Sequence, residues 1–218
     1  MTFTACRKPE VGRGVFEFTN KTYLAMGDSY TAGDAVYVGD SFPVQLVAKL
    51  NASGVKTDPP HVFAFTGWTT TNLLEALKLY RLDDKYDFVT LLIGVNNQYM
   101  KQSKEVYRQE FRELLDIAVS HSRGGRATVF VLSIPDWSVT PFGKLKDTEE
   151  AVREVASFNE INRKESGDAS VTYIDITEIS RLAAIDPAYT SGDSLHPSGK
   201  MYAEWAEKLF PLVKARVF

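Results

Sequence analysis

Short runs of apolar and β-branched residues alternate along this chain with longer segments in which apolar residues recur at helical spacing. Such alternation is typical of an α/β domain built on a parallel sheet. Five runs are predicted to be strands: 23–26, 61–65, 87–93, 127–132 and 171–176. The third and fourth are apolar on both faces, as expected of interior parallel strands.

The segments between and after these runs predict amphipathic helices, each with one apolar stripe that would pack against the sheet. The three clearest stripes consist of Leu73, Leu74, Leu77 and Tyr80; Phe111, Leu114, Leu115 and Ala118; and Tyr202, Trp205, Ala206 and Leu209. The last helix is predicted to start near Pro197, because proline suits a first helical position. No internal repeat or linker interrupts the pattern, so we expect one domain over residues 21–218 preceded by an N-terminal arm, 1–20.

The composition is that of an ordinary folded domain, and it argues against some classes of partner. The chain is 44% hydrophobic and 24% charged, far from the composition of disordered chains. Its 25 basic and 28 acidic side chains give a net charge of −3, and its pI is near 5.7. We therefore expect no nucleic-acid partner. No stretch approaches the roughly 18 consecutive apolar residues of a membrane span.

Cys6 is the only cysteine, which excludes an intramolecular disulfide and a cysteine-based metal cluster. As written, the chain starts without the charged and apolar regions of a secretory signal, which favours a cytoplasmic protein. The alternative is a periplasmic or outer-membrane lipoprotein anchored at Cys6. Residues 3–6, followed by a polar segment, resemble the end of a bacterial lipoprotein signal, and the true start would then lie upstream.

The residues that follow the predicted strands include several of the types that take part in catalysis. Ligands of open α/β sheets bind beyond the carboxyl ends of the strands. The segments at those ends are Gly27-Asp28-Ser29-Tyr30-Thr31-Ala32-Gly33 after the first strand, Thr66-Gly67-Trp68 after the second, Gly94-Val95-Asn96-Asn97 after the third, and Asp193-Ser194-Leu195-His196-Pro197 before the last helix. A serine, a histidine, an aspartate, a glycine and an asparagine are thus expected at one edge of the sheet. These are the residue types that a site for acyl transfer requires.

In this order, the segments resemble the SGNH, or GDSL-like, hydrolase superfamily, whose name lists its Ser, Gly, Asn and His. The resemblance implies a three-layer α/β/α sandwich with a five-stranded parallel sheet in flavodoxin-like order. It also implies a serine hydrolase that cleaves carboxylic esters without a cofactor. The chain departs from the strict pattern at Tyr30, where the family string has Leu, and at Asn97, where Asp is frequent. The second departure leaves open how the Asn96 loop is held.

The residues themselves support this chemistry. Serine is a weak nucleophile unless a base removes its proton and a third group orients that base. Of the three histidines, His196 is the suitable base for Ser29, because His61 begins a strand at the opposite edge and His121 ends a helix. Asp193, one turn before His196, can fix the imidazole tautomer. Asp175, at the end of the fifth strand, is the rival acid.

An oxyanion formed at the acyl carbon needs hydrogen-bond donors. The Ser29 and Gly67 backbone N–H groups and the Asn96 side-chain amide would supply three. Trp68, Asn97 and Trp137 are weaker candidates for contact with the substrate, and the two tryptophans could equally be packing residues. Asp28 is expected to anchor the turn through hydrogen bonds between its side chain and the backbone rather than to act as the triad acid.

Each of these residues also has a purely structural explanation. Ser29 could cap a helix, Asn96 and Gly67 could serve turns, and His196 could be a polar residue at a helix start. A small acyl or acetyl ester, possibly linked to a carbohydrate, is the favoured substrate, because no hydrophobic lid is evident. A lysophospholipase, a thioesterase, an acyltransferase and a non-catalytic glycan-binding module remain alternatives on the same fold. Three scattered histidines and the absence of dinucleotide or P-loop motifs give no reason to expect a metal or a cofactor.

Overall fold

Five parallel strands form the centre of the molecule in the computed structural model, which describes residues 20–80, 82, 85–146 and 148–218. The sheet order is β2-β1-β3-β4-β5. The strands are β1 (Tyr23–Gly27), β2 (His61–Ala64), β3 (Phe88–Leu92), β4 (Val129–Leu132) and β5 (Thr172–Ile174). This is the flavodoxin-like order, in which the chain reverses its direction of growth between β1 and β3.

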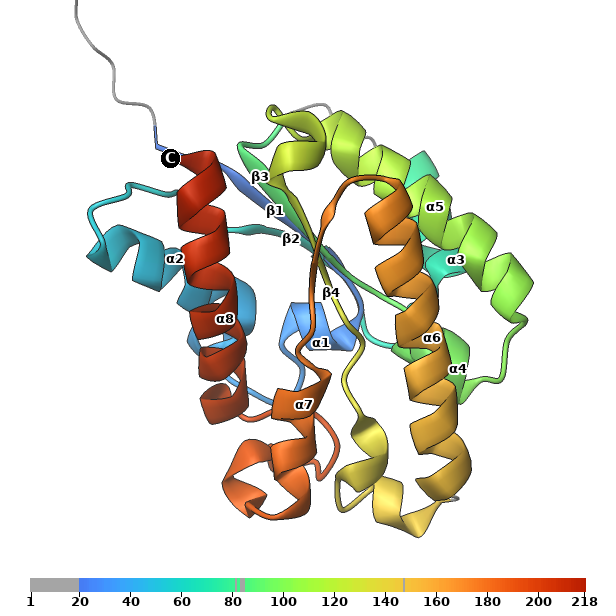
Figure 1. Cartoon of the computed structure of the whole chain (residues 1–218). Helices are drawn as coiled ribbons and strands as arrows, with labels where there is room; N and C mark the ends of the chain where they lie inside the picture. The colour runs from blue at the N-terminus through green and yellow to red at the C-terminus, as the bar shows by residue number, and fades with distance from the viewer. Residues whose placement is uncertain (1–19, 81, 83–84, 147) are drawn as a thin grey trace, which may run out of the picture.

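Eight α-helices connect or flank these strands in the described residues. They are α1 (Ser29–Ala32), α2 (Phe42–Ala52), α3 (Thr70–Leu79), α4 (Val95–Tyr99), α5 (Lys104–His121), α6 (Thr148–Asp168), α7 (Thr177–Ser180) and α8 (Gly199–Val217). Helices α2 and α8 pack together over one face of the sheet, while α3, α5 and α6 cover the other (Figure 1). The predicted three-layer α/β/α fold is confirmed.

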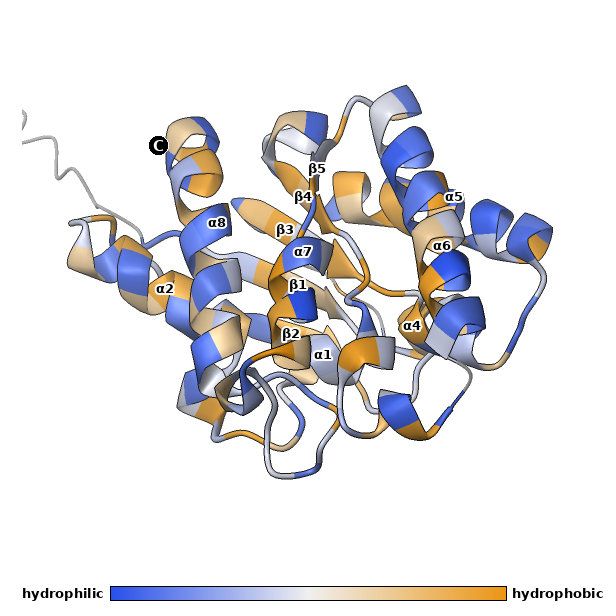
Figure 2. Ribbon diagram, turned by 60° about the horizontal axis from the view of Figure 1, so that its bottom comes forward, coloured by the Kyte–Doolittle hydropathy of each residue, from blue (hydrophilic) through white to orange (hydrophobic). Residues whose placement is uncertain are grey.

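The strands are apolar because both faces of the sheet are covered. Every residue of β1, β3 and β4 is buried, and Figure 2 shows hydrophobic residues concentrated on the central strands, with polar residues on the outward faces of the helices. The predicted stripes of α5 and α8 are buried as well. The sequence prediction of interior parallel strands is therefore confirmed for the third and fourth runs.

Two predicted helix details were wrong. Tyr80 does not belong to the apolar stripe of α3, because the helix ends at Leu79 and Tyr80 adopts an extended conformation with 68% of its surface exposed. The last helix, α8, does start near Pro197 as predicted, but Pro197 is not its first residue, because the helix begins at Gly199. Instead Ser198 is the N-cap, with its hydroxyl accepting from the Met201 N–H, while Pro197 pairs with Thr190 in an isolated bridge. Capping serines set helix starts in this way.

The strand register brings the carboxyl ends of the central strands level with one another. Gly27 of β1 pairs with Ala64 of β2 and with Leu92 of β3. The segments that follow these residues therefore emerge side by side at one edge of the sheet. Figure 1 labels the short helices α1 and α4, which follow β1 and β3 there. The predicted N-terminal arm and Cys6 lie outside the described residues, except for Asn20.

Candidate active site

Ser29 is the first residue of α1 and directly follows the turn out of β1. Asp28 caps this helix, because its Oδ1 accepts from the Tyr30 N–H at 3.0 Å. A Cβ on Gly27 would lie 2.2 Å from Thr31 Oγ1 and 2.3 Å from the Leu92 carbonyl oxygen, so only glycine fits this tight turn. The turn places Ser29 at the carboxyl edge, and the predicted anchoring role of Asp28 is confirmed.

His196 and Asp193 come from the loop that precedes α8. The Ser191 N–H donates to the His196 carbonyl at 2.8 Å, which closes this loop on itself. Asp193 Oδ2 lies 2.5 Å from His196 Nδ1, and the other ring nitrogen, Nε2, lies 2.9 Å from Ser29 Oγ. The three side chains therefore form one continuous chain of hydrogen bonds, with the imidazole in the middle.

The environment of Asp193 favours its ionised form. Partial burial raises the pKa of this carboxyl, but the hydrogen bond from His196 and those from the Leu195 and His196 backbone N–H groups outweigh that effect and lower the pKa to about 2. The carboxylate is thus available to orient an imidazole at all ordinary pH values. The rival acid, Asp175, instead lies 2.9 Å from Arg163 and accepts from the Thr177 N–H.

Gly67 and Asn96 are the other two residues expected beside Ser29. Gly67 has a φ of +79°, which a residue with a side chain adopts only with strain. The Asn96 side chain donates to the Trp68 carbonyl at 3.0 Å, which fixes the amide and leaves its second N–H for another acceptor. Both residues line the same cavity as Ser29 and His196.

Of the three residues expected to contact the substrate, only Trp137 lines the cavity. Trp137 is buried and lines the cavity, with its indole N–H donating to Gln98 Oε1 at 2.7 Å. Trp68 does not line the cavity and packs against Phe63 and Phe65, with ring centroids 5.8 and 5.9 Å away. Asn97 is fully buried away from it.

Asn97 instead holds the loop that carries Asn96. Its amide donates to Thr70 Oγ1 at 2.7 Å and to Gln102 Oε1 at 2.8 Å, while its oxygen accepts from the Thr70 N–H at 3.0 Å. Adjacent residues of a helix point about 100° apart, so Asn96 and Asn97 cannot both face the cavity. An amide thus ties α4 to the start of α3.

The cavity above Ser29 is small and largely apolar. Its volume is about 210 Å³. The remaining lining residues are Tyr30, Thr66, Val95, Tyr99, Phe142 and Leu195. Sequence reasoning missed Tyr99 and Phe142. Tyr99 could have been found, because it lies three residues after Asn96 on the same helix and so shares its face. Phe142 lies in an irregular segment, where no periodicity marks it.

The buried carboxyl group of Asp28, next to Ser29, leads to a prediction about stability. Burial raises the pKa of Asp28 from 3.8 to about 8, and its Oδ2 has no hydrogen-bond partner among the described residues. Between pH 4 and 8 the folded chain keeps a proton that the unfolded chain loses, so the free energy of unfolding should fall as pH rises. Asp28→Asn removes this titration and keeps an acceptor for the Tyr30 N–H.

We therefore expect Asp28→Asn to gain stability relative to the wild type as pH rises from 5 to 8, by at most about 1.4 kcal/mol per pH unit. Urea unfolding of both proteins at pH 5 and at pH 8 measures this difference. If the free energy of unfolding changed equally in the two proteins between pH 5 and pH 8, Asp28 would not be protonated in the folded state.

The described residues hold no group of three or more His, Cys, Asp or Glu side chains placed to bind a metal ion. Among the helices of the described chain, none combines the length and the apolar character that crossing a membrane requires.

Comparison with known proteins agrees with the fold. The model of the GDSL-like lipase/acylhydrolase family matches residues 25–204. This match spans more than half of the chain, so the chain belongs to the GDSL-like lipase/acylhydrolase family. No protein with a curated description matches the sequence significantly.

Solved structures share the fold at low sequence identity. TesA is 15% identical with a TM-score of 0.71, and the match covers 91% of this chain and 100% of TesA. Axe2, an acetylxylan esterase from Geobacillus stearothermophilus, is 16% identical with a TM-score of 0.68, covering 88% and 94% of the two chains. A lipase/acylhydrolase from Enterococcus faecalis is 18% identical with a TM-score of 0.68, covering 89% and 96%.

Proposed function

We propose that this protein hydrolyses carboxylic esters with a small acyl group through a Ser29–His196–Asp193 triad. The observation that carries the proposal is the position of the His196 ring, whose two nitrogens lie 2.9 Å from Ser29 Oγ and 2.5 Å from Asp193 Oδ2. This geometry meets the requirement for an activated serine: a base within hydrogen-bond reach, itself oriented by a third group.

In the first half of the reaction, Ser29 Oγ attacks the acyl carbon while its proton moves to His196 Nε2. Asp193 accepts the hydrogen bond of the Nδ1–H and stabilises the imidazolium that forms. The bond to the alcohol then breaks, and His196 returns the proton to the leaving oxygen. In the second half, water attacks the acyl-enzyme, His196 takes a proton from this water, and the acid is released as Ser29 recovers its proton.

The negative charge that develops on the carbonyl oxygen requires donors fixed in advance. The Ser29 and Gly67 backbone N–H groups and the free N–H of Asn96 serve this role. The hydrogen bond from Asn96 to the Trp68 carbonyl supports the assignment, because it holds the amide in place before the substrate arrives.

The size of the cavity supports a small acyl group. A water molecule occupies about 30 Å³ of liquid, so 210 Å³ has room for roughly seven atoms of similar size. The apolar walls formed by Tyr99, Trp137 and Phe142 suit a short hydrocarbon chain. An acetyl or other short acyl group therefore fits better than the chain of a long-chain lipid.

Labelling with a fluorophosphonate tests the nucleophile without presupposing a substrate. We expect intact-protein mass spectrometry to find one adduct on the wild type, because an activated serine attacks the phosphorus, and no adduct on Ser29→Ala. Ser53→Ala, which changes a serine at the end of α2, is the matched control and should be labelled like the wild type. A folded wild-type protein that forms no adduct would contradict the proposal and favour the glycan-binding alternative.

A further inference from the structure

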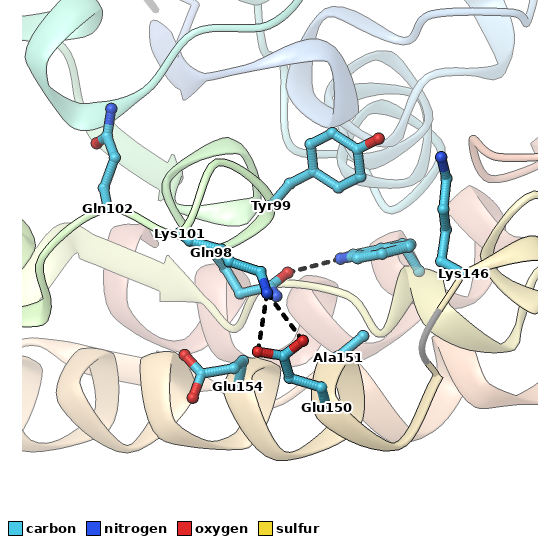
Figure 3. Close-up of a pocket in the computed structure, with 9 residues that line it drawn as sticks. Gln98, Tyr99, Lys101, Gln102, Lys146, Glu150, Ala151 and Glu154 are labelled. Carbon is cyan, nitrogen blue, oxygen red and sulfur yellow. Dashed lines mark hydrogen bonds and ion pairs between the residues drawn. The ribbon is translucent and has the colours of Figure 1, made fainter.

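A second, larger cavity adjoins the one above Ser29. It has a volume of about 480 Å³, and we call it the trough; Figure 3 shows the residues that line it. Tyr99 and Trp137 line both cavities, so they form the wall between them. The other lining residues of the trough are Gln98, Lys101, Gln102, Lys146, Glu150, Ala151 and Glu154. One molecule can therefore occupy both cavities, with its middle beside Tyr99.

The lining of the trough contains charged residues but carries no net formal charge. Its lining includes two lysines, 101 and 146, and two glutamates, 150 and 154. Lys101 Nζ lies 2.9 Å from both carboxylate oxygens of Glu150, as Figure 3 shows, and Glu154 pairs with Lys104 at 3.0 Å. Because the charges balance, the trough favours an uncharged ligand over an ionic one. An apolar chain would fit poorly, since it would remove these charged groups from water.

Gln98 lines this space with a polar side chain. The residue is only 5% exposed, and its Oε1 accepts from the Trp137 indole N–H. Its side chain extends among the lining residues in Figure 3. Because its oxygen is bonded to Trp137, the NH₂ group is the part of Gln98 that can donate to a hydroxyl or ether oxygen of a ligand.

Aromatic rings complete the wall next to these polar groups. The Tyr99 side chain is 44% exposed, and its ring meets Trp137 edge to face at a centroid distance of 5.2 Å. Such rings offer an apolar surface to the C–H groups of a sugar, while the amides and carboxylates bind its hydroxyls. The volume is that of about sixteen waters, enough for one sugar ring and its hydroxyl groups.

We propose that the trough binds the alcohol part of the ester, and that this part is an uncharged polyhydroxylated group. The proposal rests on the proposed function, because it assigns the acyl group to the apolar cavity over Ser29. Tyr99 then lies beside the ester linkage and separates the acyl group from the polyol.

The test compares two esters of one acyl group: 4-nitrophenyl acetate, whose alcohol is aromatic, and methyl 6-O-acetylglucoside, whose alcohol is a neutral polyol. The variant Lys101→Met/Glu154→Leu removes one cation and one anion from the trough, so the net charge is unchanged. We expect the ratio of the KM for the glucoside ester to the KM for the nitrophenyl ester to rise about tenfold, the effect of losing one or two hydrogen bonds. Acetylcholine, with a charged alcohol, should be a poorer substrate than the glucoside ester.

The matched control is Lys164→Met/Glu160→Leu, which makes the same two changes on the exposed face of α6 and should leave the ratio at the wild-type value. An unchanged ratio in the trough variant would overturn the proposal, as would a wild-type protein that does not hydrolyse the glucoside ester or prefers acetylcholine. If the wild type cleaves neither acetate and Ser29 forms no fluorophosphonate adduct, the proposed function fails and the trough assignment fails with it.

Discussion

Replacing Ser29 with alanine should lower kcat for 4-nitrophenyl acetate by about 10⁴- to 10⁶-fold, and His196→Ala should have a comparable effect. The hydrogen bond of 2.9 Å between Ser29 Oγ and His196 Nε2 makes the two side chains one functional unit. Without His196, no base removes the proton of the Ser29 hydroxyl; without Ser29, His196 has no nucleophile to activate. The double variant should therefore be no slower than the slower single variant, rather than showing the product of two large losses.

Steady-state kinetics of the wild type, the two single variants and the double variant measure this non-additivity. His61→Ala is the control, because His61 begins β2 at the far edge of the sheet, where its ring contacts the Tyr86 hydroxyl. Thermal unfolding of each variant checks that loss of activity is not loss of fold. Near-normal activity in folded Ser29→Ala would refute the mechanism, and additive losses would show that the two residues act separately.

The architecture could be predicted because burial determines the sequence of interior strands. β3 and β4 are apolar at nearly every position, a pattern that parallel strands covered on both faces require. The convergence of Ser29, Gly67 and Asn96 then follows from topology alone, since parallel strands bring their carboxyl ends to one edge. The roles of these residues in catalysis stay predictions until activity is measured.

The direction in which single side chains point could not be predicted. Trp68 follows Gly67 directly, yet its ring turns toward the end of β2 and packs on Phe63. Asn97 follows Asn96, yet it faces the protein interior because successive helical positions point apart. These directions depend on backbone angles in short, irregular segments, and the sequence constrains such angles only where glycine or proline is required.

The trough could not be predicted from the sequence, for a related reason. Its walls come from α4, from the segment around Trp137 and from α6, which are far apart along the chain. Glu150 and Glu154 are spaced as on any exposed helical face, and nothing local distinguishes them from a solvated surface. Only packing of α4 and α6 on the same side of the sheet brings them opposite Lys101.

The second large effect is expected for Asp193→Asn, which should reduce kcat/KM by about 10³- to 10⁴-fold while the protein stays folded. Asp193 Oδ1 accepts from Ser191 Oγ at 2.7 Å and from the backbone N–H groups of Leu195 and His196, both at 2.9 Å. An asparagine oxygen can keep these three bonds, but its NH₂ then faces His196 Nδ1. That nitrogen must become an acceptor, so the ring proton moves to Nε2, which can no longer take the proton of Ser29.

This argument predicts a separation between stability and activity that a general weakening of the loop would not produce. Asp193→Asn should unfold at a temperature close to that of the wild type, whereas Asp193→Ala should lose both activity and stability, because it also removes the acceptor for three donors. Asp175→Asn is the matched control and should stay active, since Asp175 pairs with Arg163. Because the pKa of Asp193 is held at about 2, any loss of wild-type activity between pH 5 and 7 must arise from a group other than this carboxylate. If Asp193→Asn instead kept its activity within tenfold of the wild type, the imidazole would have to be oriented by another group, and the triad assignment would be wrong.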